Sequence, residues 1–271
     1  MVSGLVILSD AIKGCYPFIE SIQSFLPVVD EMVIVVNPYC TDKTEEVVRN
    51  HLWEITPGEQ IRFVHAAFDI AKYGWQSYAI ARTTGYQACK GDVVAMFDAD
   101  GILHEKDILL LRARLAEQEN NELFPSAYWL KNRIYKPDLY WDQKKHSGIY
   151  TKKYLGDNFD FYHPDGRGIP NWSRTSVVKS RQLDITLFGY EHIWDTKEMV
   201  MEKAARYGKM LDEKAGRPIK DKDTYFKEYI NNLKDGLKEK GKHMDIKMHP
   251  AIIKEKLANL NESHFGYNFF Q

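Results

Sequence analysis

Short apolar runs alternate with amphipathic segments through the first hundred residues, and no other feature constrains the fold as strongly. Polar or turn residues bound four apolar runs, which span 4–10, 31–37, 61–68 and 92–100. Helical spacing follows the first three runs, and we expect helices around 19–25, from Lys43 and at 77–91. This alternation is typical of parallel strands joined by crossover helices. The sequence therefore predicts an α/β fold with a mixed, mostly parallel central sheet flanked by helices.

The residue pattern changes after a further helix, which is predicted at about 104–119. Residues 126–175 contain many aromatic side chains, and their pattern indicates strands and long loops. Long loops inside a compact domain are usually functional. Most of these aromatics are expected to belong to the core, but Trp141 and Trp172 lie among polar residues, which suits stacking on a sugar ring or a base better than deep burial. The stretch HPDGRGIPNW in this region is expected to act as a lid that excludes water.

The pattern becomes helical again near the C-terminus. The sequence DTKE predicts a helix capped by Asp195, and further helices are expected from about Asp223 and over 249–260. We therefore divide the chain into a domain of residues 1–195 and a helical C-terminal extension of residues 196–271.

Composition narrows the class of protein. The chain has 271 residues, 44% of them hydrophobic and 28% charged, and 37 basic residues against 38 acidic ones give a net charge of −1. A balance so close to neutral gives no general attraction to nucleic acid or to an anionic membrane. The three cysteines lack metal-site spacing and the apolar runs are too short for a membrane helix. We therefore expect a soluble protein in the cytoplasm.

Two carboxylates end the fourth apolar run, in the sequence VVAMFDAD. Residues two apart on a strand share a face, so Asp98 and Asp100 are expected to point the same way. Ligands of open α/β sheets bind beyond the carboxyl ends of the strands, where Ser9, Asp10 and Asn37 are also expected. Paired carboxylates suit Mg²⁺ or Mn²⁺ bound together with a substrate diphosphate. The alternative is a chance match, because Asp-x-Asp is a short pattern.

Residues 4 to about 110 resemble a known family. The stretch from GLVILSDAIKG to DKTEEVV is similar to the start of family 2-like glycosyltransferases of the GT-A fold, and ARTTGYQACKGDVVAMFDADGILHEKDI looks like their helix, apolar strand and metal-binding Asp-x-Asp motif. The resemblance implies a GT-A, Rossmann-like fold. It also implies that residues 1–110 bind the nucleotide sugar and residues 111–195 bind the acceptor.

The resemblance implies roles for individual residues. Ser9 and Asp10 would lie beside the base and ribose, Asn37 beside the base, and Arg82 in the helix that borders the donor. Asp100 would bind the Mn²⁺ or Mg²⁺ ion that holds the donor's diphosphate. Asp98 would contact either the ribose or the same metal ion. A UDP-sugar is the favoured donor and a GDP-sugar the alternative. The competing interpretation is that Ser9, Asp10 and Asn37 form caps or turns and that Arg82 forms an ordinary ion pair.

An inverting transfer also needs a carboxylate that removes the acceptor's proton. The stretch FGYEHIWDTKE offers Glu191, which we predict to be the base, because Asp195 is expected to cap the following helix. His192 is a candidate third metal ligand, the alternative being a hydrogen-bonded structural histidine.

The sequence thus favours a metal-dependent, inverting glycosyltransferase that acts on a hydroxyl acceptor. The acceptor is a glycan, a lipid-linked sugar, a protein, a small molecule or a modified nucleobase. Two alternatives are a nucleotidyltransferase of related fold, disfavoured because LSDAIKGCYPF has a single glycine and a single lysine, and a non-catalytic protein that binds carbohydrate or nucleotide.

Overall fold

The computed structural model describes residues 1–55, 60–67, 76–121, 123–161, 180–190 and 192–268, without the side chains of residues 55, 142–147 and 268. The elements up to residue 119 are β1 (Val2–Leu8), α1 (Phe18–Phe25), β2 (Glu31–Val36), α2 (Thr44–Ile55), β3 (Ile61–His65), α4 (Gln76–Ala88), β4 (Val93–Phe97), β5 (Gly101–Ile102) and α5 (Ile108–Glu119). The later elements are β6 (Ser126–Lys136), β7 (Leu139–Thr151), α6 (Lys152–Leu155), β8 (Ser180–Gly189), α7 (Lys197–Lys214), α8 (Lys222–Lys240), β9 (Gly241–His243), α9 (Lys254–Ala258) and α10 (Phe265–Asn268). The α/β architecture expected from the sequence is confirmed.

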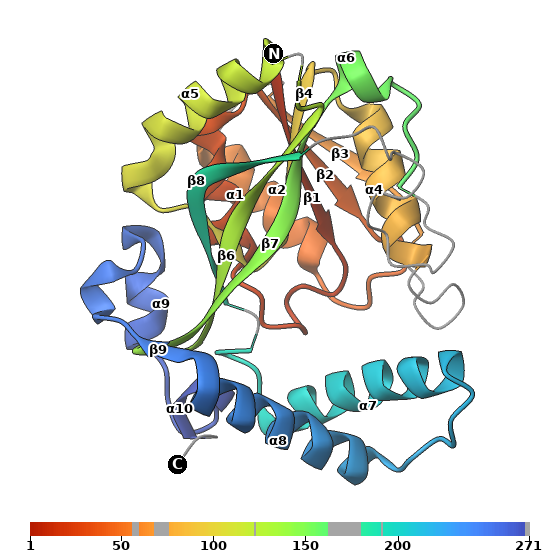
Figure 1. Cartoon of the computed structure of the whole chain (residues 1–271), viewed down its shortest axis with the longest axis vertical. Coiled ribbons are helices and arrows are strands. Elements are labelled where there is room, and N and C mark those ends of the chain that lie inside the picture. Colours follow the sequence, from red (N-terminus) through yellow and green to blue (C-terminus); the bar gives the residue numbers. More distant parts are fainter. Residues whose placement is uncertain (56–59, 68–75, 122, 162–179, 191, 269–271) are drawn as a thin grey trace.

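The strands of the described residues form one nine-stranded sheet in the order β3-β2-β1-β4-β7-β6-β8-β5, with β9 paired to β7 (Figure 1). The first four strands are parallel, and β7 joins β4 in the antiparallel direction. The β6–β7 pair is a long antiparallel hairpin, and β8 runs parallel to β6. The sheet is therefore mixed, with its parallel half built from the first hundred residues.

Both faces of the parallel half are covered. Every residue of β2 and β4 is buried. One face packs on α1 through residues such as Ile22 and Phe25, and the other packs on α4 through Ala79 and Tyr86. Continuous apolar runs are what strands buried on both faces require. This is why the sequence shows runs here rather than alternation.

The C-terminal helices pack against the far end of the β6–β7 hairpin (Figure 1). A cluster there joins Tyr135 of β6 to Val200 of α7 and Phe226 of α8. Trp141 of β7 lies on α8, where an added Cβ at Gly236 would be 2.1 Å from its ring. Trp141 is thus partly buried against α8, and its role as a platform for a sugar stays a prediction.

Two helix predictions are corrected. The N-cap of α7 is Thr196, whose hydroxyl accepts from the Met199 amide, so Asp195 does not cap the helix. The helix predicted over 249–260 is only the five-residue α9 preceded by a 3₁₀ turn at Ala251–Ile253.

None of the helices in the described part of the chain combines the length and apolar character that a membrane crossing requires.

Candidate active site

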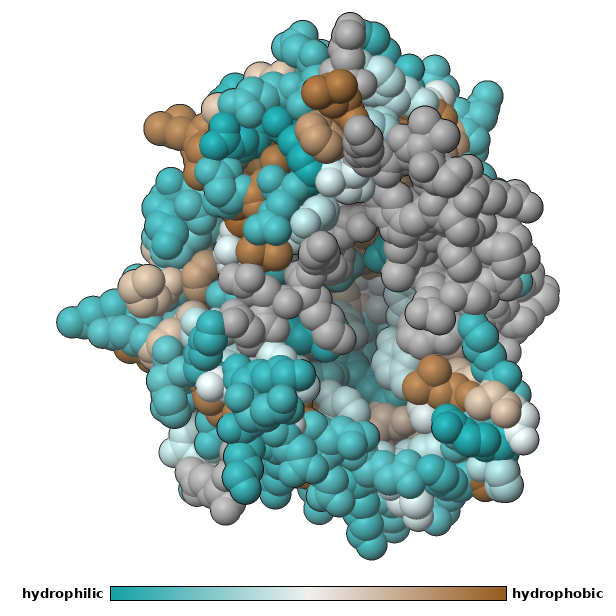
Figure 2. Space-filling model, in the orientation of Figure 1, coloured by the Kyte–Doolittle hydropathy of each residue, from teal (hydrophilic) through white to brown (hydrophobic). Residues whose placement is uncertain are grey.

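The carboxyl ends of β1, β2 and β4 meet at one edge of the sheet, because these strands are parallel neighbours. Leu8 pairs with Val36 and Val6 with Phe97, so the polar residues that follow each strand come together. This edge faces the α7–α8 pair (Figure 1). In the space-filling view, the molecule is hollowed between the sheet and these helices, and hydrophilic residues line much of the hollow (Figure 2).

The loops after β1 and β2 are hydrogen-bonded to each other. The Asn37 amide Nδ2 donates to Ser9 Oγ at 2.9 Å, and Asn37 Oδ1 accepts from the Tyr39 amide at 3.1 Å. Asp10 Oδ1 accepts from the amide of Thr41 at 2.6 Å and from its hydroxyl at 3.0 Å. Asp10 has a φ of 45°, a left-handed conformation that aspartate tolerates better than most residues. The structure thus brings Ser9, Asp10 and Asn37 together where the loops after β1 and β2 are hydrogen-bonded to each other.

A further acidic group lies in the same loops. Asp10, Cys40 and Asp42 form the one set of three potential metal ligands, among the described residues, whose ligand atoms lie within 4.8 Å of one another. Burial raises the pKa of Asp42, but hydrogen bonds from the Thr44 hydroxyl and the Lys13 amide outweigh it, so the pKa is lowered. Burial raises the pKa of the Cys40 thiol. Asp10 and Asp42 also fix the loops, because their carboxylates accept hydrogen bonds from the amides of Thr41 and Lys13.

The Asp98–Asp100 segment is a tight turn whose backbone is held by hydrogen bonds from α1 and from the end of β8. The Gly101 amide donates to the Asp98 carbonyl at 3.0 Å. Ser21 of α1 donates its hydroxyl to the carbonyls of Asp98 and Gly101, at 3.0 and 2.7 Å. The Tyr190 amide donates to the Asp100 carbonyl at 2.9 Å. Helix α1 and strand β8 thus hold the backbone, which leaves both carboxylates to face the same partner.

That partner is Lys131 of β6. Its Nζ lies 2.9 Å from each carboxylate oxygen of Asp100 and 3.3 Å from Oδ2 of Asp98. Lys131 is 4% exposed and Asp100 is 5% exposed. Sequence reasoning did not single out Lys131. The sequence does contain one indication. Lys131 lies two and four residues after the buried residues Trp129 and Ala127, so on a strand its side chain is expected to point inward with theirs.

The arrangement fits a hard cation. Three carboxylate oxygens converge within 3.3 Å of one nitrogen, so the Lys131 ammonium marks a point where positive charge is stabilised. Oxygen atoms so placed are the donors that Mg²⁺ and Mn²⁺ prefer. Asp98 and Asp100 therefore point toward the same position, as expected, but they do so from the turn that follows β4 and not as alternate residues of an extended strand.

Arg82 of α4 lies beside the same turn. Its Nη2 is 3.7 Å from Asp98 Oδ1. Tyr150 of β7 lies close by in the core, where burial raises its pKa, the Arg82 guanidinium lowers it and the Asp98 carboxylate raises it. The pKa of Tyr150 is raised overall, so this hydroxyl stays neutral beside the charged groups.

His192 and Asp195 form a separate cluster at the start of α7. His192 Nδ1 and Asp195 Oδ2 are hydrogen-bonded at 2.8 Å, and Lys203 Nζ donates to the same oxygen at 2.8 Å. His192 is not brought together with Asp98 and Asp100 in any set of three ligands among the described residues. Glu191, the predicted base, lies outside the described residues, as do Trp172 and the stretch HPDGRGIPNW.

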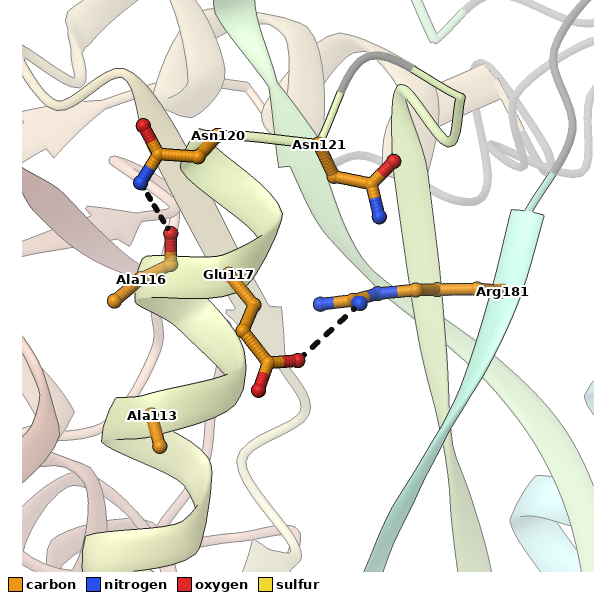
Figure 3. A pocket seen from close by; sticks show the side chains of 6 residues that line it. All are labelled: Ala113, Ala116, Glu117, Asn120, Asn121 and Arg181. Atoms are coloured by element: carbon orange, nitrogen blue, oxygen red, sulfur yellow. Dashed lines mark hydrogen bonds and ion pairs between the residues drawn. The ribbon is translucent and has the colours of Figure 1, made fainter.

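A surface depression of about 710 Å³ lies elsewhere, between α5 and the start of β8 (Figure 3). Its lining includes Glu117 and Asn120 of α5 and Arg181 of β8. The Arg181 guanidinium reaches across it to Glu117 at 3.4 Å. This depression is lined by none of the strand-end residues and is not part of the candidate site.

Comparison with solved structures supports the fold. The chain aligns with the mannosyltransferase PcManGT from Pyrobaculum calidifontis, in complex with GDP-Man and Mn²⁺, at 14% identity and a TM-score of 0.52. The alignment covers 76% of this chain and 61% of the mannosyltransferase, so this chain corresponds to less than two thirds of that protein. At such low identity the likeness concerns the fold alone.

Two further structures are more distant. One is S. aureus TarS in complex with UDP, at 16% identity and a TM-score of 0.44 over 76% of this chain and 64% of that one. The other is a nucleotidyl transferase from Methanothermobacter thermautotroptrophicus, at 16% identity and a TM-score of 0.38 over 70% of this chain and 87% of that one. Their TM-scores are too low to bear on the argument. A comparison with curated proteins found no match.

The sequence itself matches a family over most of the sheet. The model for glycosyl transferase family 2 aligns with residues 16–170, which is more than half of the chain and includes both strand-end aspartates. The GT-A fold expected from the sequence is therefore confirmed, and the chain belongs to glycosyl transferase family 2.

Proposed function

We propose that this protein transfers a sugar from a nucleotide-diphosphate sugar to a hydroxyl acceptor with inversion, and that the reaction depends on a divalent metal ion. The observation that carries the proposal is the convergence of Asp98 and Asp100 on one cation position at the end of β4. Family membership supports the reaction class. The three free cysteines agree with the cytoplasmic location that we propose.

The donor would lie across the carboxyl ends of β1, β2 and β4. In this proposal Ser9, Asp10 and Asn37 contact the base and ribose, and their mutual hydrogen bonds hold them in place before the donor arrives. Such preorganisation lowers the entropic cost of binding. A UDP-sugar is our favoured donor. A GDP-sugar is the alternative, which the complex of the Pyrobaculum mannosyltransferase with GDP-Man illustrates.

The negative charge on the leaving diphosphate requires compensation. Asp98 and Asp100 would hold Mn²⁺ or Mg²⁺, and the bound ion would supply Lewis-acid stabilisation of the departing phosphate oxygens. Arg82, beside Asp98, adds fixed positive charge at the same edge of the sheet. Glu191 remains our proposed base. We do not extend the proposal to His192 as a ligand, because no set of three potential ligands among the described residues joins it to Asp98 and Asp100.

The test is the variant Asp100→Asn, studied by calorimetric titration with UDP and GDP in the presence and absence of Mn²⁺. We expect the variant to lose Mn²⁺-dependent nucleotide binding and hydrolysis of the donor sugar. The matched control is Asp184→Asn. This variant changes an exposed aspartate of β8 that is paired with Arg114 of α5, away from the candidate site. Circular dichroism establishes that each variant is folded.

The outcomes separate the functional classes. Mn²⁺-dependent binding that survives in Asp100→Asn would overturn the proposal. Turnover of a nucleoside triphosphate instead of a nucleotide sugar would indicate a nucleotidyltransferase, and carbohydrate binding that ignores the nucleotide would indicate a non-catalytic protein.

A further inference from the structure

The buried ammonium of Lys131 lies at the point that the proposed function assigns to a divalent ion. It contacts both oxygens of Asp100 at 2.9 Å and one oxygen of Asp98 at 3.3 Å. We propose that Lys131 is an internal counter-cation of the two aspartates, and that a divalent ion binds only by displacing it. This inference rests on the proposed metal site and adds a residue that controls how tightly the site binds metal.

Burial makes the pairing strong. A carboxylate such as Asp100, with only 5% of its surface exposed, is costly to bury without a partner. Lys131 supplies that partner from a different strand, two positions away in the sheet. Lys131 thus compensates the charge of the two aspartates from within the protein.

Charge repulsion makes the two cations alternatives. An ammonium and a divalent ion cannot both lie within contact of the same three oxygens, because like charges a few ångströms apart repel strongly at low dielectric. Metal binding therefore includes the cost of breaking the Lys131 contacts. A substitution that weakens the contacts of Lys131 with the aspartates should therefore raise the affinity for the metal ion.

The space for Lys131 depends on one glycine. A Cβ added at Gly189 of β8 would lie 2.3 Å from Lys131 Cε and 3.2 Å from its Cδ and Cγ. Real atoms do not approach so closely, so a side chain at position 189 would push the lysine stem away from the aspartates. Gly189 thus offers a way to move the ammonium without removing its charge.

The experiment measures Mn²⁺ binding to the full chain without nucleotide, from the electron paramagnetic resonance signal of free Mn²⁺. We compare the wild type with Lys131→Met, Lys131→Arg and Gly189→Ala. Lys131→Met keeps the length of the stem and removes the charge, and we expect it to bind Mn²⁺ at least about tenfold more tightly. Lys131→Arg keeps the charge and should stay close to the wild type. Gly189→Ala should shift the affinity in the same direction as Lys131→Met.

Thermal unfolding provides a second measurement. Without metal, Lys131→Met should melt at a lower temperature than the wild type, and Mn²⁺ should raise its melting temperature by more than it raises that of the wild type. If Lys131→Met does not fold, Gly189→Ala alone decides the question through its Mn²⁺ affinity.

The outcomes distinguish this inference from the proposed function. If the wild type binds Mn²⁺ and Lys131→Met binds it no more tightly, the role of Lys131 is refuted while the metal site stands. If neither protein binds Mn²⁺ with or without UDP, the metal dependence in the proposed function is refuted together with the inference.

Discussion

Ser21 is a residue whose effect on the site is exerted entirely through the backbone. Its hydroxyl donates to the carbonyls of Asp98 and Gly101, and its side chain is buried under the turn. We predict that Ser21→Ala lowers the free energy of unfolding by about 1–3 kcal/mol, because the turn loses the buried hydrogen bond from this hydroxyl to the Gly101 carbonyl and its weaker contact with the Asp98 carbonyl. Chemical denaturation measures the loss. Mn²⁺-dependent UDP binding should weaken as well, because the turn that holds both carboxylates loosens.

The control for this prediction is Ser263→Ala, which removes an exposed hydroxyl that bonds only to nearby Asn261 in the described structure. It should change stability by less than about 0.5 kcal/mol. Equal effects of the two substitutions would show that Ser21 does not anchor the turn.

The sequence allows the aspartates to be predicted and leaves Lys131 unpredicted for a physical reason. Asp98 and Asp100 directly follow β4, so the apolar run places them at the strand end, and the turn closed by the Gly101 amide brings their carboxylates together. The partner of Lys131 depends on the order of strands, because β7 lies between β4 and β6 in the sheet. A local pattern shows that Lys131 faces inward, but it does not show what Lys131 meets there.

At the scale of elements, Glu31 ties four segments together at the edge opposite the candidate site. It accepts from the Ser3 hydroxyl of β1 at 2.6 Å, from Arg62 of β3 at 2.8 Å and from the amide of Lys90. Burial raises the pKa of Glu31, but these hydrogen bonds outweigh it and the pKa is lowered. Glu31 therefore stabilises the fold when it is ionised.

The pH dependence follows from this direction. Because the folded-state pKa lies below the unfolded value of about 4.3, the stabilisation is complete above that value and is lost as the pH falls through the folded pKa. We predict that Glu31→Gln is less stable than the wild type by about 1–3 kcal/mol at pH 7. The difference should shrink below about pH 4, as measured by urea unfolding across a pH series.

Glu255→Gln, an exposed substitution on α9, controls for the change of residue type. A stability difference for Glu31→Gln that stays constant from pH 7 to about pH 3 would contradict the assignment.

Elements were predicted best where burial is uniform. Strands β2 and β4 are buried at every residue, and a continuous apolar run has few alternative structures, whereas the half-buried β3 is predicted from its place in the alternation of strands and helices. The helix expected over 249–260 is shorter in the structure, because between Pro250 and Asn259 the chain forms a 3₁₀ turn and only the five-residue α9. The cap of α7 was misplaced by one residue because Asp195 is held by His192 and Lys203, a contact made by tertiary structure.

At the scale of the whole molecule, the C-terminal segment is part of the packing around the sheet. β9 pairs with β7, and the amides of Phe265 and Gly266 donate to the carbonyls of Asp195 and Ile193. The division at residue 195 remains a prediction about sequence organisation, and these contacts bear on whether residues 1–195 can fold alone.

We predict that a chain of residues 1–195 does not melt cooperatively, because removing 196–271 uncovers Tyr135 and Trp141 of the hairpin. Differential scanning calorimetry and solubility measure this. Adding residues 196–271 as a separate polypeptide should restore solubility if the loss comes from the uncovered surface. A soluble 1–195 chain with a sharp melting transition would show instead that the helices are dispensable for folding.

The continuous sheet has a mechanical consequence. The ladder between β4 and β7, with pairs such as Val93 with Thr151 and Ala95 with Ile149, joins the two halves of the domain directly through backbone hydrogen bonds. A clamshell opening between the halves would have to rupture that ladder. Entry and exit of small molecules at the strand ends would therefore rely on local movement of side chains and not on a hinge between β4 and β7.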